Sequence, residues 1–207
     1  MKNQNIPMKR LFTSLCALLV SLAALTARAQ TDTVIDPQGD AFYTPGLAAP
    51  AFLDILAASI TISDTITLTV DVAGSLDALP DPSGGYFDWH FPLNTDNSTD
   101  PPGYPLPPNQ TAPAEFGVDA DWDGTAFSGV LYDRRPALTG QPALLYSIPV
   151  SVSGSRITLT IPTALAAQVR ASVVLPGATW NCITGWVSGN HGLHGADDIG
   201  GRRPWPQ

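Results

Sequence analysis

The chain has 207 residues, 44% hydrophobic and 14% charged, with a net charge of −8. This length suits one domain with a sizeable core, and the apolar content argues against disorder. Residues 30–207 carry 18 acidic side chains against six arginines and no lysine, a net charge of −12. Such an acidic chain is not a general nucleic-acid-binding protein, which needs a basic surface.

The first 29 residues have the organisation of a secretory signal peptide. A basic segment precedes an apolar run over residues 11–25, which is too short for a lasting membrane span, and an A-x-A cleavage motif follows at residues 27–29. We therefore expect cleavage near Ala29 and a single secreted or periplasmic domain over residues 30–207, without a membrane span. An uncleaved anchor is the alternative. The basic segment before the apolar run contains Lys2, Lys9 and Arg10.

Cysteine usage supports no disulfide in the exported chain. Cys16 lies in the expected signal peptide, which leaves Cys182 alone. With Trp180 and Ile183 beside it, Cys182 is expected to be a small buried hydrophobe rather than a nucleophile.

Hydrophobic and polar residues alternate repeatedly along the rest of the chain, which is typical of half-buried strands. Residues 66–72, for example, place four aliphatic side chains on one face and polar ones on the other. Turn motifs rich in Gly, Pro and Asp separate these segments. The expected strands are residues 57–62, 66–72, 86–91, 116–122, 126–132, 147–152, 156–161 and 179–187.

Only residues 162–168 have a helical pattern, with Pro162 suited to the helix N-terminus. Short strands separated by turns at this spacing predict an all-β fold. We expect an antiparallel β-sandwich, of jelly-roll or immunoglobulin-like type, with this single short helix.

The acidic segment at residues 119–124 is the strongest chemical signal. Its D-x-D-x-D-G pattern opens many calcium loops, because alternate carboxylates surround the ion and glycine permits a sharp turn. Val130 occupies the twelfth position, where an EF-hand needs Glu, so an EF-hand is excluded. In an extended strand these carboxylates would lie about 7 Å apart and would need help from the preceding loop, and a solvated acidic face is the alternative. The predicted calcium ligands are Asp96, Asp100, Asp119, Asp121 and Asp123.

A second group of acids, Asp36, Asp40 and Asp54, could form another oxygen cluster, although turn residues need no ion. His191 and His194 have a spacing that a transition metal can use, but the surrounding glycines favour a plain loop. His90 follows Asp88 by two positions on an expected strand, where a surface pair is the favoured reading.

Aromatic residues offer a route to carbohydrate binding. Trp180 and Trp186 share one face of the last expected strand, and together with Tyr104 they could stack on sugar rings if exposed. Burial in the core is the favoured alternative. Enzyme signals are poor: G-x-S-x-G and H-E-x-x-H are absent, and the exported chain has one glutamate, Glu115, and no lysine.

Several short motifs occur in an order that resembles secreted bacterial β-sandwich modules of the DOMON-like, family 9 carbohydrate-binding-module-like type. The resemblance implies a β-sandwich fold, and members of this type bind sugars or haem or have no known ligand. Met/His haem ligation is impossible here, because both methionines precede residue 30. The motifs are D-x-x-G-D at residues 36–40, Asp54-Ile55, and residues 94–97, 116–119 and 196–199.

These observations predict a secreted, non-catalytic binding module, stabilised by calcium, with a glycan as the candidate partner. Two alternatives stay open. One is a structural or adhesive cell-surface protein without a small ligand, and the other is a secreted glycoside-active enzyme.

Overall fold

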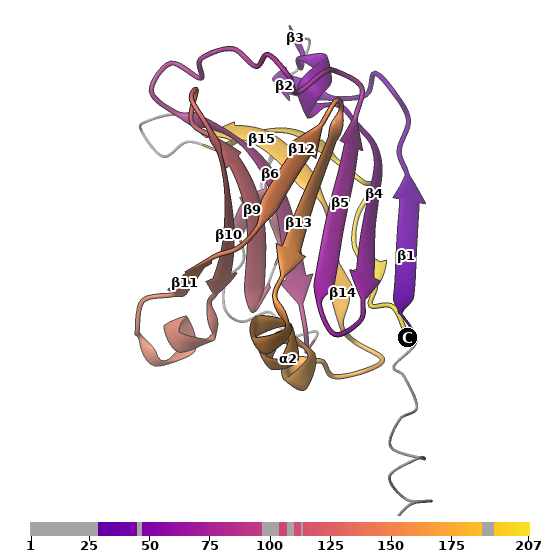
Figure 1. The fold of residues 1–207 in the computed structure, drawn as a ribbon, viewed down its shortest axis with the longest axis vertical. Coiled ribbons are helices and arrows are strands. Elements are labelled where there is room, and N and C mark those ends of the chain that lie inside the picture. The colour runs from indigo at the N-terminus through magenta and orange to yellow at the C-terminus, as the bar shows by residue number, and fades with distance from the viewer. Residues whose placement is uncertain (1–28, 45–46, 97–103, 107–109, 113, 188–192) are drawn as a thin grey trace, which may run out of the picture.

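The structure is a computed structural model in which two antiparallel β-sheets pack face to face (Figure 1). This arrangement confirms the predicted all-β sandwich. The described residues are 29–44, 47–96, 104–106, 110–112, 114–187 and 193–207.

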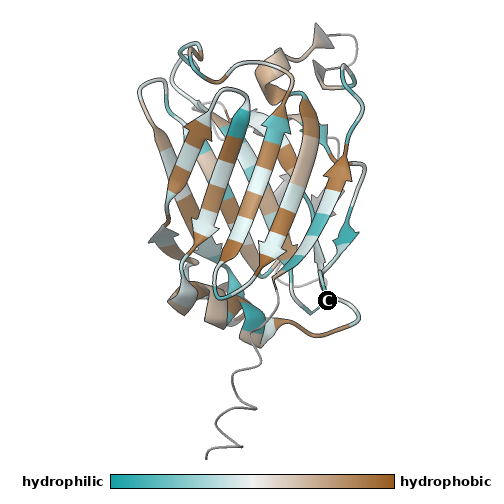
Figure 2. Cartoon of the chain, turned by 45° about the vertical axis from the view of Figure 1, so that its right-hand side comes forward, coloured by the Kyte–Doolittle hydropathy of each residue, from teal (hydrophilic) through white to brown (hydrophobic). Residues whose placement is uncertain are grey.

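The first sheet has five strands in the order β1-β4-β5-β13-β12, all antiparallel to their neighbours. Hydrophobic residues alternate with polar ones along β5, β12, β13 and the second half of β4, so that one face of the sheet is apolar. Figure 2 shows this alternation as brown and pale bands along the strands. The strands are β1 (Gln30–Ile35), β4 (Ile55–Ile62), β5 (Ile66–Val72), β12 (Val150–Ser153) and β13 (Arg156–Ile161).

The second sheet has eight strands and is organised around β6. Strand β9 pairs along one side of β6, while β14 and β15 pair along the other side. Six of the strands follow the order β11-β10-β9-β6-β14-β17. The other two lie off this order: β15 pairs with β6, and β16 pairs with β15. The strands are β6 (Tyr86–Asn94), β9 (Phe116–Trp122), β10 (Phe127–Asp133), β11 (Leu144–Ser147), β14 (Thr179–Trp180), β15 (Ile183–Val187), β16 (Leu193–Asp198) and β17 (Arg203–Pro204).

The core lies between the two sheets. Trp89 and Phe91 project into it from β6 and are fully buried, as is Phe116 from β9. Ile60 and Leu68 meet them from the other sheet. Because successive side chains of a strand point to opposite faces, Asp88 and His90 of β6 point away from this core.

Short elements close the ends of the sandwich. The β2–β3 hairpin lies at the upper end in Figure 1 and α2 at the lower end. Helix α2 begins at Thr163, one residue after the predicted start, because Pro162 is its N-cap, and it extends to Ser172. The short elements are β2 (Phe42–Thr44), β3 (Leu47–Ala48), η1 (Ala51–Leu53), β7 (Tyr104–Leu106), β8 (Gln110–Ala112), η2 (Arg135–Thr139) and α2 (Thr163–Ser172).

Two predicted strands are each divided in the structure. The segment at residues 147–152 ends β11 in one sheet and begins β12 in the other, because the chain crosses between the sheets at Ile148 and Pro149. The segment at residues 179–187 becomes β14 and β15, interrupted at Asn181 and Cys182.

Cys182 is buried, which confirms that prediction. No helix among the described residues is long and apolar enough to span a membrane. The proposed signal peptide at residues 1–29 lies almost wholly outside the described residues.

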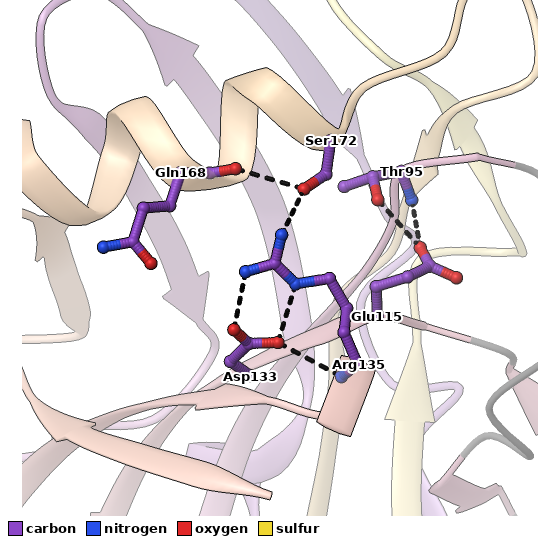
Figure 3. A network of polar contacts seen from close by, with 6 residues as sticks. All are labelled: Thr95, Glu115, Asp133, Arg135, Gln168 and Ser172. Carbon is purple, nitrogen blue, oxygen red and sulfur yellow. Dashed lines mark hydrogen bonds and ion pairs between the residues drawn. The ribbon is translucent and has the colours of Figure 1, made fainter. Parts of the chain in front are cut away.

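A polar network fastens the end of β10 to helix α2 (Figure 3). Arg135 donates from Nε and Nη2 to the two carboxylate oxygens of Asp133, at 2.8 and 2.6 Å, and from Nη1 to the Ser172 hydroxyl at 2.7 Å. Its guanidinium also lies over the Phe116 ring, 4.6 Å from the centroid. Beside this network, Glu115 accepts hydrogen bonds from the amide and hydroxyl of Thr95.

We expect Arg135→Lys to lower the free energy of unfolding by about 1 kcal/mol, because an ammonium cannot reproduce this planar fork. Urea unfolding measures the change. The matched control is Arg156→Lys, at an exposed pair with Asp71, where the midpoint should stay unchanged. Equal effects at both positions would contradict a structural role for the Arg135 network.

Candidate metal centre

Three carboxylates from distant parts of the chain meet beside β16. Asp36 directly follows β1, Asp40 lies four residues later, and Asp197 belongs to β16. Each offers an oxygen atom, and these oxygens all lie within 4.8 Å of one another. Two ligands of one calcium ion, each bonded at about 2.3–2.6 Å, are at most about 5 Å apart. The spacing therefore suits a single calcium ion.

Backbone hydrogen bonds hold the turn between Asp36 and Asp40. The amide of Gly39 donates to both carboxylate oxygens of Asp54, at 3.0 and 2.9 Å. Gly39 has φ = 87°, a left-handed conformation that glycine adopts without strain. The Asp36 amide donates to the Leu56 carbonyl at 2.9 Å. Asp54 therefore shapes the turn that brings the other acids together.

Asp197 is oriented by backbone amides. Its Oδ2 accepts from the amide of Ile55 at 2.6 Å, and its Oδ1 accepts from the amide of Asp198 at 2.9 Å. The first of these bonds connects β16 to the start of β4, so the site joins the N-terminal and C-terminal parts of the domain.

The three carboxylates lie close to one another and are partly shielded from water. Asp36 is only 9% exposed, and its Oδ2 is buried without a hydrogen-bond partner among the described residues. Burial, reinforced by the charges of Asp40, Asp198 and Asp54, raises the pKa of Asp36 to about 6. Burial is the main cause that raises the pKa of Asp197 to about 7, and the negative charges of Asp36 and Asp40 add to it. The hydrogen bond from the Ile55 amide acts in the opposite direction. A divalent cation would relieve this repulsion.

A second cluster lies on the outer face of the eight-stranded sheet. Antiparallel pairing places His90 opposite Asp119 and Asp88 opposite Asp121. His90, Asp119 and Asp88 are all at least 97% buried, and Nδ1 of His90 contacts Oδ1 of Asp119. The predicted surface pair of Asp88 and His90 is therefore wrong.

Burial dominates the electrostatics of this second cluster. It raises the pKa of Asp88 well above its usual value, with further increases from Asp119 and Asp121. It raises the pKa of Asp121 to about 8, again with help from Asp119. It lowers the pKa of His90, against the opposing charges of Asp88 and Asp121.

The structure does not bring the five predicted calcium ligands together. Strands β6 and β9 are neighbours, as expected, but they run antiparallel. Asp96, beyond the end of β6, therefore lies at the Phe116 end of β9, whereas Asp123 follows the opposite end at Trp122. Asp100 lies outside the described residues.

Asp123 has a local structural role. It is exposed, and its Oδ1 accepts from the amide and hydroxyl of Thr125 at 2.8 and 2.7 Å and from the amide of Ala126 at 2.9 Å. These hydrogen bonds lower the pKa of Asp123. Asp123 therefore stabilises the turn between β9 and β10, while Asp119 and Asp121 belong to the cluster with His90.

The predicted aromatic platform is not present at Trp180. This side chain is 1% exposed, lies in the core, and donates from Nε1 to Oδ2 of Asp32 at 3.0 Å. Trp186 is partly buried against the same core and donates to the Pro82 carbonyl at 3.1 Å. Tyr104 begins β7, and its side chain lies outside the described part of the structure. The alternative that the tryptophans fill the core is confirmed for Trp180.

The segment around the two histidines was expected to be a plain loop, but it forms strand β16 from Leu193 to Asp198 and contributes one acid to the candidate site. Asp197, which follows the two histidines in sequence, joins Asp36 and Asp40. His191 lies outside the described residues, as does the side chain of His194 in β16. The sequence predicted Asp36 and Asp40 as members of an oxygen cluster but did not predict Asp197 as their partner. The one signal for Asp197 was the order of the motifs at residues 36–40 and 196–199.

Comparison of the chain with protein-family models, curated proteins and solved structures gives no match.

Proposed function

We propose that this protein is a secreted, non-catalytic β-sandwich binding module whose fold is stabilised by a calcium ion bound to Asp36, Asp40 and Asp197. The observation that carries the proposal is the buried, unpartnered Oδ2 of Asp36 within a group of three converging carboxylates. A buried carboxylate oxygen is costly unless a hydrogen bond or a cation satisfies it.

The donor set favours calcium over other common cations. All three ligand side chains supply oxygen, the donor atom of calcium and magnesium. Calcium tolerates irregular geometry and 6–8 ligands, including water, whereas magnesium demands a near-ideal octahedron at shorter distances. The exposure of Asp40 leaves room for water to complete the shell.

Export and a binding role rest on the sequence. The signal-peptide pattern at residues 1–29 and the order of motifs that resembles DOMON-like modules support them. Extracellular modules bind calcium with dissociation constants of about 10⁻⁴–10⁻³ M, so a modest site would suffice outside the cell. Glycan stacking on Trp180 is not part of the proposal, because the ring lies in the core.

Calcium would act by joining the two ends of the domain. Asp36 and Asp40 follow the edge strand β1, and Asp197 lies in β16, an edge strand of the other sheet. An ion shared by these residues would hold the chain after β1 against the opposite layer. A binding surface on either sheet would then keep its shape.

The test is calorimetric titration of calcium into the full chain. We expect one site, at least about tenfold weakening in Asp36→Asn and Asp197→Asn, and no change in Asp64→Asn, which removes one charge from an exposed turn. Calcium binding that survives both ligand substitutions, or no binding at all, would overturn the proposal.

A further inference from the structure

The cluster on the outer face of β6 and β9 has a different composition from the calcium candidate. It contains a histidine, and three of its members, Asp88, His90 and Asp119, each offer a ligand atom within 4.8 Å of the others. Asp121 lies directly across from Asp88 in the antiparallel register. The two groups share no residue.

Asp88 is the residue that points to a ligand. It is 3% exposed, and its Oδ1 is buried with no hydrogen-bond partner among the residues that the structure describes. Native proteins satisfy nearly all buried polar atoms, so an orphaned carboxylate oxygen beside an imidazole requires an explanation. A buried Oδ1 of Asp121 is likewise without such a partner in the described part of the chain.

We propose that Asp88, His90 and Asp119 bind a divalent first-row transition metal ion, for which zinc is the probe, with Asp121 supplying a fourth ligand. Imidazole nitrogen and carboxylate oxygen together form a borderline donor set that zinc accepts in tetrahedral geometry. In tetrahedral geometry, zinc bonds of about 2.0–2.2 Å place ligand atoms about 3.4 Å apart. The most widely separated ligand atoms of the group, at most 4.8 Å apart, would therefore move about 1.4 Å closer together or less around the ion.

The charge of the cluster matches a divalent cation. Asp88, Asp119 and Asp121 supply three carboxylates, and Arg134 is the basic side chain whose charge acts on His90. Three carboxylates against one guanidinium leave two negative charges when all are ionised. A divalent ion would neutralise them in a site that water hardly reaches.

The local backbone is shaped to accommodate the imidazole. Gly117 lies on β9 beside His90, and a Cβ built there would approach Cε1 of the ring to 2.9 Å. That separation is shorter than a normal carbon–carbon contact. Glycine at this position therefore leaves the ring free to lie against β9 and contact Asp119.

The experiment is a zinc titration of the full chain in saturating calcium, followed by X-ray absorption at the zinc edge. We expect one equivalent of zinc, with one nitrogen and otherwise oxygen ligands. The variants Asp88→Asn and His90→Gln should bind zinc at least about a hundredfold more weakly, and Gly117→Ala should also weaken it by displacing the ring. Asp64→Asn is the control for loss of one negative charge.

Calcium binding provides the cross-check. Asp36→Asn should retain zinc binding, and His90→Gln should retain calcium binding, so failure of either proposal is visible separately. Asp88→Asn preserves side-chain shape, and circular dichroism verifies its fold. Zinc affinity unchanged in Asp88→Asn, a sulfur ligand from Cys182, or no zinc bound by the native chain would each overturn the proposal.

Discussion

Replacing Trp180 with Ala is expected to lower the free energy of unfolding by about 3–5 kcal/mol, the usual cost of removing a large buried aromatic side chain. Trp180 is 1% exposed, and its Nε1 hydrogen bond to Asp32 connects β14 in one sheet to β1 in the other. The substitution leaves a cavity and also removes one partner of that carboxylate, whose other partner is Arg203 at 3.6 Å. Urea unfolding followed by far-ultraviolet circular dichroism measures the loss.

Two further variants separate the contributions. Trp180→Phe keeps most of the ring volume and removes the hydrogen bond, so a loss of about 1–2 kcal/mol is expected. Trp186→Ala, at a partly buried position, should cost less than Trp180→Ala. A Trp180→Ala protein as stable as the native chain would mean that Trp180 is a surface residue, as a sugar-stacking platform requires.

Calcium should raise the thermal stability of the domain substantially. With a dissociation constant of about 10⁻⁴ M, calcium at a hundredfold excess over that value adds about 2.7 kcal/mol by mass action. For a domain of this size the melting temperature should rise by about 5–10 °C relative to a chelator. Differential scanning calorimetry in calcium and in chelator measures the shift.

The controls address screening and site identity. Asp197→Asn should reduce the shift by about half or more, because it removes the ligand contributed by β16, whereas Asp64→Asn should preserve it. Sodium chloride at matched ionic strength should produce only a small change, since screening acts on all surface charges. An equal shift in the native and Asp197→Asn proteins would locate the effect elsewhere.

The strands of this fold were predictable where hydrophobic residues alternate strictly. The predicted segments 66–72 and 116–122 coincide with β5 and β9, because hydrophobic residues occupy every second position of each. Strand β5 buries only those positions, whereas β9 buries five successive residues. Strand β1 was missed, because its edge position requires few hydrophobic residues and four of its six side chains are exposed. The change of sheet at Pro149 was also missed, since a hydrophobic pattern does not show which sheet a strand joins.

The candidate sites depend on pairing that local motifs do not encode. The D-x-D-x-D-G pattern begins on the predicted strand 116–122, and the structure confirms this strand. The pattern predicts help from the loop before it, but the residue that contacts Asp119 is His90 of β6, 29 residues away along the chain. Asp36 and Asp197 are still farther apart in sequence and meet only when both sheets have formed.

A crystal structure of the protein grown in calcium is the decisive test of calcium binding at Asp36, Asp40 and Asp197. Electron density for one ion is expected between Asp36, Asp40 and Asp197, with carboxylate and water oxygens about 2.3–2.6 Å away. The buried Oδ2 of Asp36 should be among those oxygens. Carboxylates at this position that share a proton, with water alone between them at millimolar calcium, would contradict it.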